Sequence, residues 1–356
     1  MTKTNQLSTS TPMFDRSAYI HIPFCEHICY YCDFNKVFLE GQPVDEYIQS
    51  LLKEIQLTQA LYPEQEMKTI YIGGGTPTSL SAKQLDVLLK GVREQLTFDD
   101  RNEFTVEANP GDLTQEKLQV MKNYGVNRLS SIDLIYALPG QTLESFRDTL
   151  TRALALDLPH YSLYSLILEN KTMFMNWVRQ GRLQLPEEEI EAQMFDETIE
   201  AMEKKGRHQY EVSNFALTGK ESQHNLAYWN NDHYYGFGAG ASGYLGQTRY
   251  KNHGPIQHYL KPLRENQLPI VETEELTRLN QIEEELFLGL RKKVGISKQK
   301  FQQKFQEPIE AIYGEVIQRL IKEELLIEEA DILRLTKKGL FVGNNVFEAF
   351  LLSEKE

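Results

Sequence analysis

Short apolar runs alternate with longer amphipathic segments through the N-terminal half of this 356-residue chain. This alternation is typical of repeated β–α units around a parallel sheet, because each helix carries the chain back to the start of the next strand. We expect strands at 18–22, 69–72, 103–108 and 161–168. We expect helices at 44–61, from Ser81 onward, at 114–124 and at 143–156. The pattern predicts an α/β fold whose strands form a partial TIM-like (β/α) barrel.

One stretch interrupts this alternation. Residues 126–138 form a single strand-like run with no helical segment inside it. Neighbouring parallel strands need a crossover of about a dozen residues or more. We therefore expect this run to hold one strand rather than two.

The second half of the chain has a different pattern. We expect an acidic helix over 187–205 and a strand over 210–213, followed by an aromatic- and glycine-rich segment from His224 to Gly246. Helices and a short hairpin near 332–336 then indicate a winged-helix-like module. The predicted division is a polar tail (1–15), a barrel domain (16–255) and a small C-terminal helical, winged-helix-like domain (256–356).

Charge and hydropathy limit the classes of partner. The chain carries a net charge of −13, which disfavours a general nucleic-acid-binding role. No stretch approaches the roughly 20 apolar residues of a membrane span, and residues 1–15 lack the apolar core of a signal peptide. We therefore expect a cytoplasmic protein without a membrane span, and peripheral membrane contact is left open.

All three cysteines of the chain, Cys25, Cys29 and Cys32, lie within eight residues, directly after the first expected strand. Their odd number disfavours a disulfide framework. Structural zinc would need a fourth ligand, which His21 or His27 could supply. A [4Fe–4S] cluster normally takes four thiolates, so three would leave one iron open to a chelating molecule. The spacing C-x3-C-x2-C favours this cluster.

Three further features fall at the ends of expected strands. The turn Gly73-Gly74-Gly75-Thr76 could bring bare backbone close to a ligand, or could serve only as a turn. Glu107 could accept hydrogen bonds from a ligand, or could face solvent. Asp133 lies in an apolar run, where a carboxylate needs partners unless it sits at a strand edge or turn. Barrel chemistry gathers at the carboxyl ends of the strands, so we expect these residues to share one edge with the cysteine loop.

These motifs together resemble the radical S-adenosylmethionine (SAM) proteins, and in particular the oxygen-independent coproporphyrinogen oxidase-like group. The resembling segments begin at Tyr19, Gly73, Glu107 and Ile132, and the similarity runs over nearly the whole chain. The dehydrogenase branch carries a further cysteine where this chain has Phe34. The motif His-Asn-x-x-Tyr-Trp at residues 224–229 instead resembles the HemW family of haem chaperones.

The resemblance implies a set of site residues, a set of partners and a function. Cys25, Cys29 and Cys32 would ligate the [4Fe–4S] cluster, and His224, Tyr228 and Trp229 would bind haem. The residues implied for SAM are Tyr19, Gly74, Gly75, Thr76, Glu107 and Asp133. The implied function is the transfer of haem to recipient haem proteins. Whether the chain forms a homodimer is left open. The alternative is an enzyme, coproporphyrinogen III dehydrogenase, and the sequence leaves open whether the chain is an enzyme.

The assignment of His224 to haem has a plainer alternative. His224 could equally be a core histidine whose ring is already hydrogen-bonded.

Between Ser130 and Ser131 this chain lacks a β–α unit of about 30 residues that the family has, and with it the family's glutamine and arginine for SAM. We therefore expect a barrel missing one unit, with weakened SAM binding and retained haem binding. A deletion product that folds poorly is the remaining alternative.

Overall fold

The structure is a computed structural model that describes residues 16–62, 66–130 and 132–352. The chain divides into two compact units, each made from two stretches of sequence. The first unit holds the chain up to Ser131 and again from Asp232 to Leu276, and the second unit holds the remainder. The predicted tail, 1–15, lies outside the described residues.

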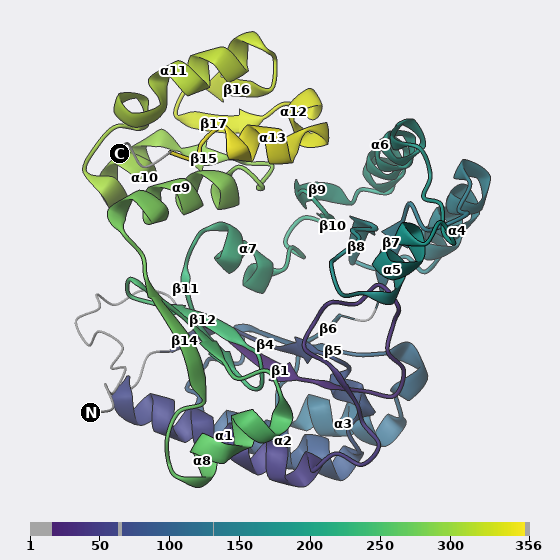
Figure 1. Ribbon diagram of the computed structural model, residues 1–356, viewed down its shortest axis with the longest axis vertical. Coiled ribbons are helices and arrows are strands. Elements are labelled where there is room, and N and C mark those ends of the chain that lie inside the picture. The colour runs from purple at the N-terminus through teal and green to yellow at the C-terminus, as the bar shows by residue number, and fades with distance from the viewer. Residues whose placement is uncertain (1–15, 63–65, 131, 353–356) are drawn as a thin grey trace. The chain divides into compact units, whose positions relative to one another are not determined.

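A sheet that is mostly parallel forms the centre of the first unit. Its strands are β1 (Arg16–Ile22), β4 (Met67–Gly74), β5 (Glu103–Glu107), β6 (Arg128–Ser130), β11 (His233–Phe237), β12 (Ser242–Leu245), β13 (Thr248–Asn252) and β14 (Ile270–Glu275). Among the described residues these eight strands run in the order β14-β13-β12-β11-β1-β4-β5-β6 (Figure 1). Pairing is parallel from β11 through β1, β4 and β5 to β6, and antiparallel from β11 to β14.

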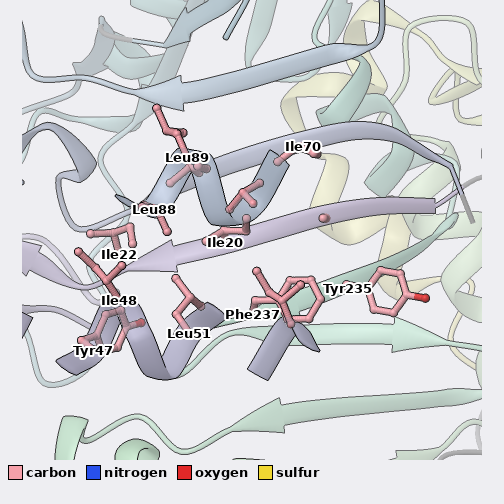
Figure 2. Packing of buried hydrophobic residues seen from close by; sticks show 14 of the residues in the cluster. Ile20, Ile22, Tyr47, Ile48, Leu51, Ile70, Leu88, Leu89, Tyr235 and Phe237 are labelled. Atoms are coloured by element: carbon pink, nitrogen blue, oxygen red, sulfur yellow. The ribbon is translucent and has the colours of Figure 1, made fainter. Parts of the chain in front are cut away.

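Helices pack against the central strands of this sheet and exclude water from them. The helices of the first unit are α1 (Val44–Leu61), α2 (Ala82–Gln95), α3 (Gln115–Asn123) and α8 (Ile256–Arg264). Strand β1 is buried along nearly its whole length, as expected for a strand in the middle of a parallel sheet. Figure 2 shows Ile20 and Ile22 of β1 in one apolar cluster with Leu51 of α1 and Leu88 of α2. This packing holds the carboxyl end of β1, from which the cysteine loop starts.

The second unit contains two smaller sheets. Its first stretch holds β7 (Asp133–Tyr136), α4 (Leu143–Ala155), β8 (His160–Ser165), α5 (Met173–Arg179), α6 (Glu188–Lys204), β9 (His208–Glu211), β10 (Asn214–Ala216) and α7 (Gln223–Trp229). Its second stretch holds α9 (Arg278–Gly289), β15 (Ile296–Ser297), α10 (Lys298–Phe305), α11 (Ile309–Lys322), β16 (Leu326–Glu329), β17 (Ile332–Leu335), α12 (Lys337–Phe341) and α13 (Gly343–Glu348). The sheet orders are β7-β8-β10-β9 and β15-β17-β16. The second sheet and its helices enclose an apolar cluster of their own.

The α/β fold class is confirmed, but the prediction for residues 126–138 is wrong. The run holds two strands: β6 pairs with β5 in the first unit, and β7 pairs with β8 in the second. The crossover requirement applies only to neighbours in one sheet, and β6 and β7 belong to different sheets. The parallel strands expected in one barrel are therefore shared between two sheets. Ser131, at the junction, lies outside the described residues.

The boundary between residues 255 and 256 stays a prediction. The compact units group α8 and β14 with the first unit, although both lie beyond residue 255. The hairpin of β16 and β17, with helices on either side of it in sequence, matches the expected helices and hairpin of the C-terminal module. No helix among the described residues is both long enough and apolar enough to cross a membrane.

Candidate functional site

The cysteine loop begins where β1 ends. Cys25 lies in a two-residue strand, β2 (Phe24–Cys25), which pairs with β3 (Val37–Phe38) and so closes the loop at its base. Cys25 is buried, Cys29 is exposed and Cys32 is half-buried. The backbone N–H of Cys32 donates to the Cys29 carbonyl at 3.1 Å, and the Lys36 ammonium donates to the Cys32 carbonyl. The loop therefore presents three free thiols from one short, braced segment.

The environment of these thiols suits a metal cluster better than free thiolates. Burial raises the pKa of Cys25 and of Cys32, while the Lys36 ammonium opposes the rise at both thiols. The Thr76 hydroxyl, 3.8 Å from the Cys25 Sγ, also lowers the pKa of Cys25. The described residues hold no group of three or more side chains arranged around one metal ion. A [4Fe–4S] cluster does not need that arrangement, because each thiolate binds a different iron. The donor set therefore fits a cluster.

The glycine turn packs directly against the cysteine loop. The Gly75 N–H donates to the Ile22 carbonyl at 2.8 Å, and a Cβ on Gly75 would lie 2.7 Å from the Pro23 carbonyl carbon. Gly74 has φ +115°, and a Cβ there would lie 2.3 Å from Nδ1 of His21. Close packing alone thus requires glycine at both positions. Their assignment to SAM stays a prediction.

Glu107 is not a solvent-facing carboxylate. The Tyr71 hydroxyl donates to its Oε1 at 2.6 Å, and the Gly74 N–H donates to its Oε2 at 2.9 Å. Tyr19 stacks on Tyr71, with ring centroids 6.2 Å apart, and burial raises the pKa of Tyr19 well above its ordinary value. The structure therefore brings Tyr19, the glycine turn and Glu107 together in the first unit, near the cysteine loop, whereas Asp133 belongs to another sheet.

His21 has a structural role that the sequence did not indicate. Its Nε2 lies 2.7 Å from the Asn35 carbonyl, which can only accept, so Nε2 carries the proton. Its Nδ1 then accepts from the Tyr19 hydroxyl at 2.8 Å. Burial lowers the pKa of His21, which keeps the ring neutral. Both nitrogens are engaged, so His21 is not free to act as the fourth ligand of a zinc site.

Asp133 belongs to the second unit, whereas the other residues assigned to SAM belong to the first. It opens β7, pairs with Ser162 of β8, and its side chain is exposed. Although this side chain is exposed, the neighbouring protein still raises its pKa by desolvation. Asp133 therefore lies at the start of β7, opposite the polar residue Ser162 of β8.

The residues assigned to haem lie on the short helix α7. His224 is buried, and its Nε2 lies 3.0 Å from the Tyr228 hydroxyl, one helical turn further on. Burial lowers the pKa of His224 to about 3, so its imidazole is neutral. The indole ring of Trp229 lies beneath the guanidinium of Arg291, whose Cζ is 4.5 Å from the ring centroid. The His224 and Tyr228 rings pack against each other, with centroids 4.9 Å apart, and the His224 imidazole is closed off from solvent.

The fold and the site define a radical SAM-type α/β protein. Residues 19–131 match the Radical SAM superfamily, and residues 276–342 match the HemN C-terminal domain. The solved structure described as "Coproporphyrinogen III oxidase (HemN) from Escherichia coli is a Radical SAM enzyme" aligns with a TM-score of 0.83, covering 96% of this chain and 91% of that chain. At 23% identity this likeness shows the fold.

Sequence relatives narrow the assignment. Heme chaperone HemW of Lactococcus lactis subsp. lactis (strain IL1403) is 47% identical, covering 95% of this chain and 98% of the relative. Heme chaperone HemW of Bacillus subtilis (strain 168) is 46% identical, covering 94% and 99%. The chain belongs to the HemW family. These alignments extend over 376 and 375 positions, more than the 356 residues of this chain, so each relative carries residues that have no counterpart here.

Proposed function

We propose that this protein is a haem chaperone that binds haem through its His-Asn-x-x-Tyr-Trp motif and passes it to recipient haem proteins in the cytoplasm. The observation that carries this proposal is the motif itself, on α7, in a chain of the HemW family. A neutral imidazole can ligate iron without first losing a proton. Aromatic rings offer flat apolar surface to a porphyrin.

Haem ligation by His224 would require α7 to open. The ring is buried, and one nitrogen is already engaged with the Tyr228 hydroxyl. Helix α7 has only seven residues, with an N-cap at Ser222 whose side chain accepts from the Asn225 N–H. So short a helix has little stability of its own, because it forms few internal backbone hydrogen bonds. We infer that the His224 imidazole would have to release the Tyr228 hydroxyl before it could hold the haem iron.

We further propose that Cys25, Cys29 and Cys32 hold a [4Fe–4S] cluster. The residues assigned to SAM are Tyr19, Gly74, Gly75, Thr76, Glu107 and Asp133. SAM bound at an open iron supplies radical chemistry when the cluster is reduced. The residues of this chain contribute positioning: Glu107 is held by Tyr71, and Thr76 lies beside the Cys25 thiol.

An anaerobic haem titration tests the chaperone proposal. We expect the wild type to give a shifted Soret band that His224→Ala loses. His160→Ala is a matched control, since His160 is half-buried in the same unit and lies 2.9 Å from a tyrosine hydroxyl, that of Tyr210. An unchanged titration in His224→Ala would move the haem site elsewhere.

The rival function is coproporphyrinogen III dehydrogenase. The dehydrogenase pattern needs a cysteine where this chain has Phe34, whose side chain is exposed beside the cysteine loop. We expect the protein with its cluster and SAM to form no protoporphyrinogen from coproporphyrinogen III under anaerobic conditions. Turnover in that assay would contradict the chaperone proposal.

A further inference from the structure

Two buried hydrogen-bond donors in the second unit lack partners. They are Nε of Arg291, just beyond α9, and Nε1 of Trp229, the last residue of α7. Neither atom has a hydrogen-bond partner in the described part of the chain. The two side chains are stacked, with the guanidinium carbon 4.5 Å from the indole centroid. A buried donor without an acceptor costs free energy, so two such donors side by side need an explanation.

The backbone around the pair is well fixed. The Lys293 N–H donates to the Tyr210 carbonyl at 3.0 Å, and Lys292 forms a bridge with Glu211 of β9. The Lys292 ammonium also donates to Oδ1 of Asn230, the residue after Trp229, at 2.6 Å. These contacts tie the segment beyond α9 both to the sheet and to the end of α7. Arg291 is therefore held on the sheet side, and the opening of α7 inferred above would expose both buried donors to a ligand.

The charge of Arg291 is also uncompensated at close range. Among the described residues no carboxylate lies within ion-pair distance of its guanidinium. Burial lowers the pKa of Arg291, and Glu211 is the nearby acidic group that opposes this. The Oε1 of Glu211 accepts from Ser213 and Asn214, and its Oε2 is buried with no partner. A partly desolvated guanidinium without a paired anion is unfavourable, which points to an anion supplied from outside the chain.

We propose that Arg291 and Trp229 bind a carboxylate group of the ligand through these two N–H donors. The inference rests on the proposed function, and the carboxylate is then a propionate of haem. A carboxylate offers two oxygens in one plane and forms charge-assisted hydrogen bonds with guanidinium groups. The site adjoins the rings of the haem motif, since Trp229 is the last residue of that motif. The imidazole would bind the iron, and this pair would orient the porphyrin by its edge.

Haem and its dimethyl ester, in which both propionates are blocked, distinguish this site from simple apolar binding. We expect the wild type to bind haem at least about tenfold more tightly than the ester, the factor expected for loss of one charge-assisted hydrogen bond. Arg291→Gln and Trp229→Phe should each weaken haem binding by a similar factor. Both should leave ester binding nearly unchanged. Trp229→Phe keeps an aromatic ring and removes only the N–H donor.

The control variant is Arg182→Gln, because Arg182 also lies over a tryptophan of the second unit, 5.5 Å from the Trp177 centroid, but is exposed. It should bind both porphyrins like the wild type. Thermal melts separate a binding role from a structural one: removing an unpaired, partly buried charge should leave the melting temperature of Arg291→Gln unchanged or raised.

Two results would overturn the proposal. Equal affinity of the wild type for haem and its ester would show that no carboxylate site exists, and would not contradict the haem chaperone function. Equal weakening of haem and ester binding in Arg291→Gln would assign Arg291 to packing alone. Failure of the wild type to bind either porphyrin would contradict the proposed function, and this site with it.

Discussion

Gly74 shows how the site excludes even one additional side-chain atom, a Cβ. Its φ of +115° disfavours any other residue, and a Cβ would also collide with the His21 ring at 2.3 Å. We expect Gly74→Ala to destabilise the protein by at least about 2 kcal/mol, from strain and collision together. Urea unfolding of the wild type and the variant measures this difference.

Gly41→Ala is the matched control for that prediction. Gly41 has φ +76°, but nothing lies within 4 Å of the place that a Cβ would occupy, so the substitution introduces backbone strain without a collision. We expect it to cost about 1 kcal/mol. Equal costs at the two positions would show that the contact between the glycine turn and His21 carries no energetic weight.

Glu54 of α1 is a second residue whose behaviour depends on its surroundings. It is fully buried, and it accepts from the Tyr259 hydroxyl at 2.5 Å, the Gly238 N–H at 2.8 Å and the Asn252 amide at 2.6 Å. Burial raises the pKa of Glu54 from 4.5 to about 7, against the effect of those donors. The folded protein therefore holds this proton more tightly than the unfolded chain does.

The sign of the resulting pH dependence follows directly. The stabilisation from protonated Glu54 is fully present below about pH 4.5 and is lost as the pH rises through about 7. The loss amounts to roughly 3 kcal/mol at most. We expect Glu54→Gln to show a smaller fall in unfolding free energy between pH 5 and pH 8 than the wild type. Parallel pH profiles for the two proteins would show that Glu54 does not titrate in this range.

At the scale of elements, helix α2 illustrates what a local pattern can specify. The Ser81 hydroxyl accepts from the Gln84 N–H at 3.2 Å, and the Gln84 side chain accepts from the Ser81 N–H at 3.0 Å. The predicted start of this helix at Ser81 is confirmed. The signal is local, because both partners lie within four residues of one another.

The free energy lost with this cap can be predicted. We expect Ser81→Ala to lower the unfolding free energy by about 1 kcal/mol. Thr142→Ala should have a similar effect on α4, where Thr142 forms the same reciprocal cap with Ser145. Thr97→Ala, at an exposed position outside any helix, serves as the control in the same denaturant titration. A loss at Thr97 equal to that at Ser81 would contradict a specific capping role.

At the scale of the whole molecule, the junction at residue 131 separates the residues assigned to SAM. Five of them lie in the first unit, while Asp133 lies in the second. The chain is also shorter than its alignments with HemW relatives, as expected if a β–α unit is missing. We propose that SAM binding is weakened because the missing unit would carry the family's glutamine and arginine for SAM.

Calorimetric titration of the protein with its cluster reconstituted tests this directly. We expect a dissociation constant for SAM well above the micromolar range, because each lost hydrogen bond to a charged group costs roughly tenfold in affinity. Glu107→Gln should weaken it further, since its two oxygens position the turn beside the cysteines. Micromolar binding by the wild type would refute the weakened-site proposal.

Prediction from the sequence succeeded where the signal was local. The cap at Ser81 depends on a few consecutive residues. The assignments of the cysteines to a cluster and of the glycine turn to SAM stay predictions. The assignment of residues 126–138 to one strand failed because strand pairing is not local. Nothing in that run indicates that Arg128 to Ser130 joins one sheet and Asp133 to Tyr136 another. The contact of Arg291 with Trp229 was missed for the same reason, because the two residues are distant in sequence.

The amino-acid sequence alone was enough to predict the α/β class, the positions of most helices and strands, and the candidate ligands of the cluster. It could do so because apolar periodicity, capping residues and ligand spacing are properties of short segments. The folded arrangement was needed to show that Glu107 is held by Tyr71, that His224 is closed off by Tyr228, and that Arg291 stacks on Trp229 with its donor unpaired. Burial and hydrogen bonding depend on residues far apart in the chain, and packing alone brings those residues together.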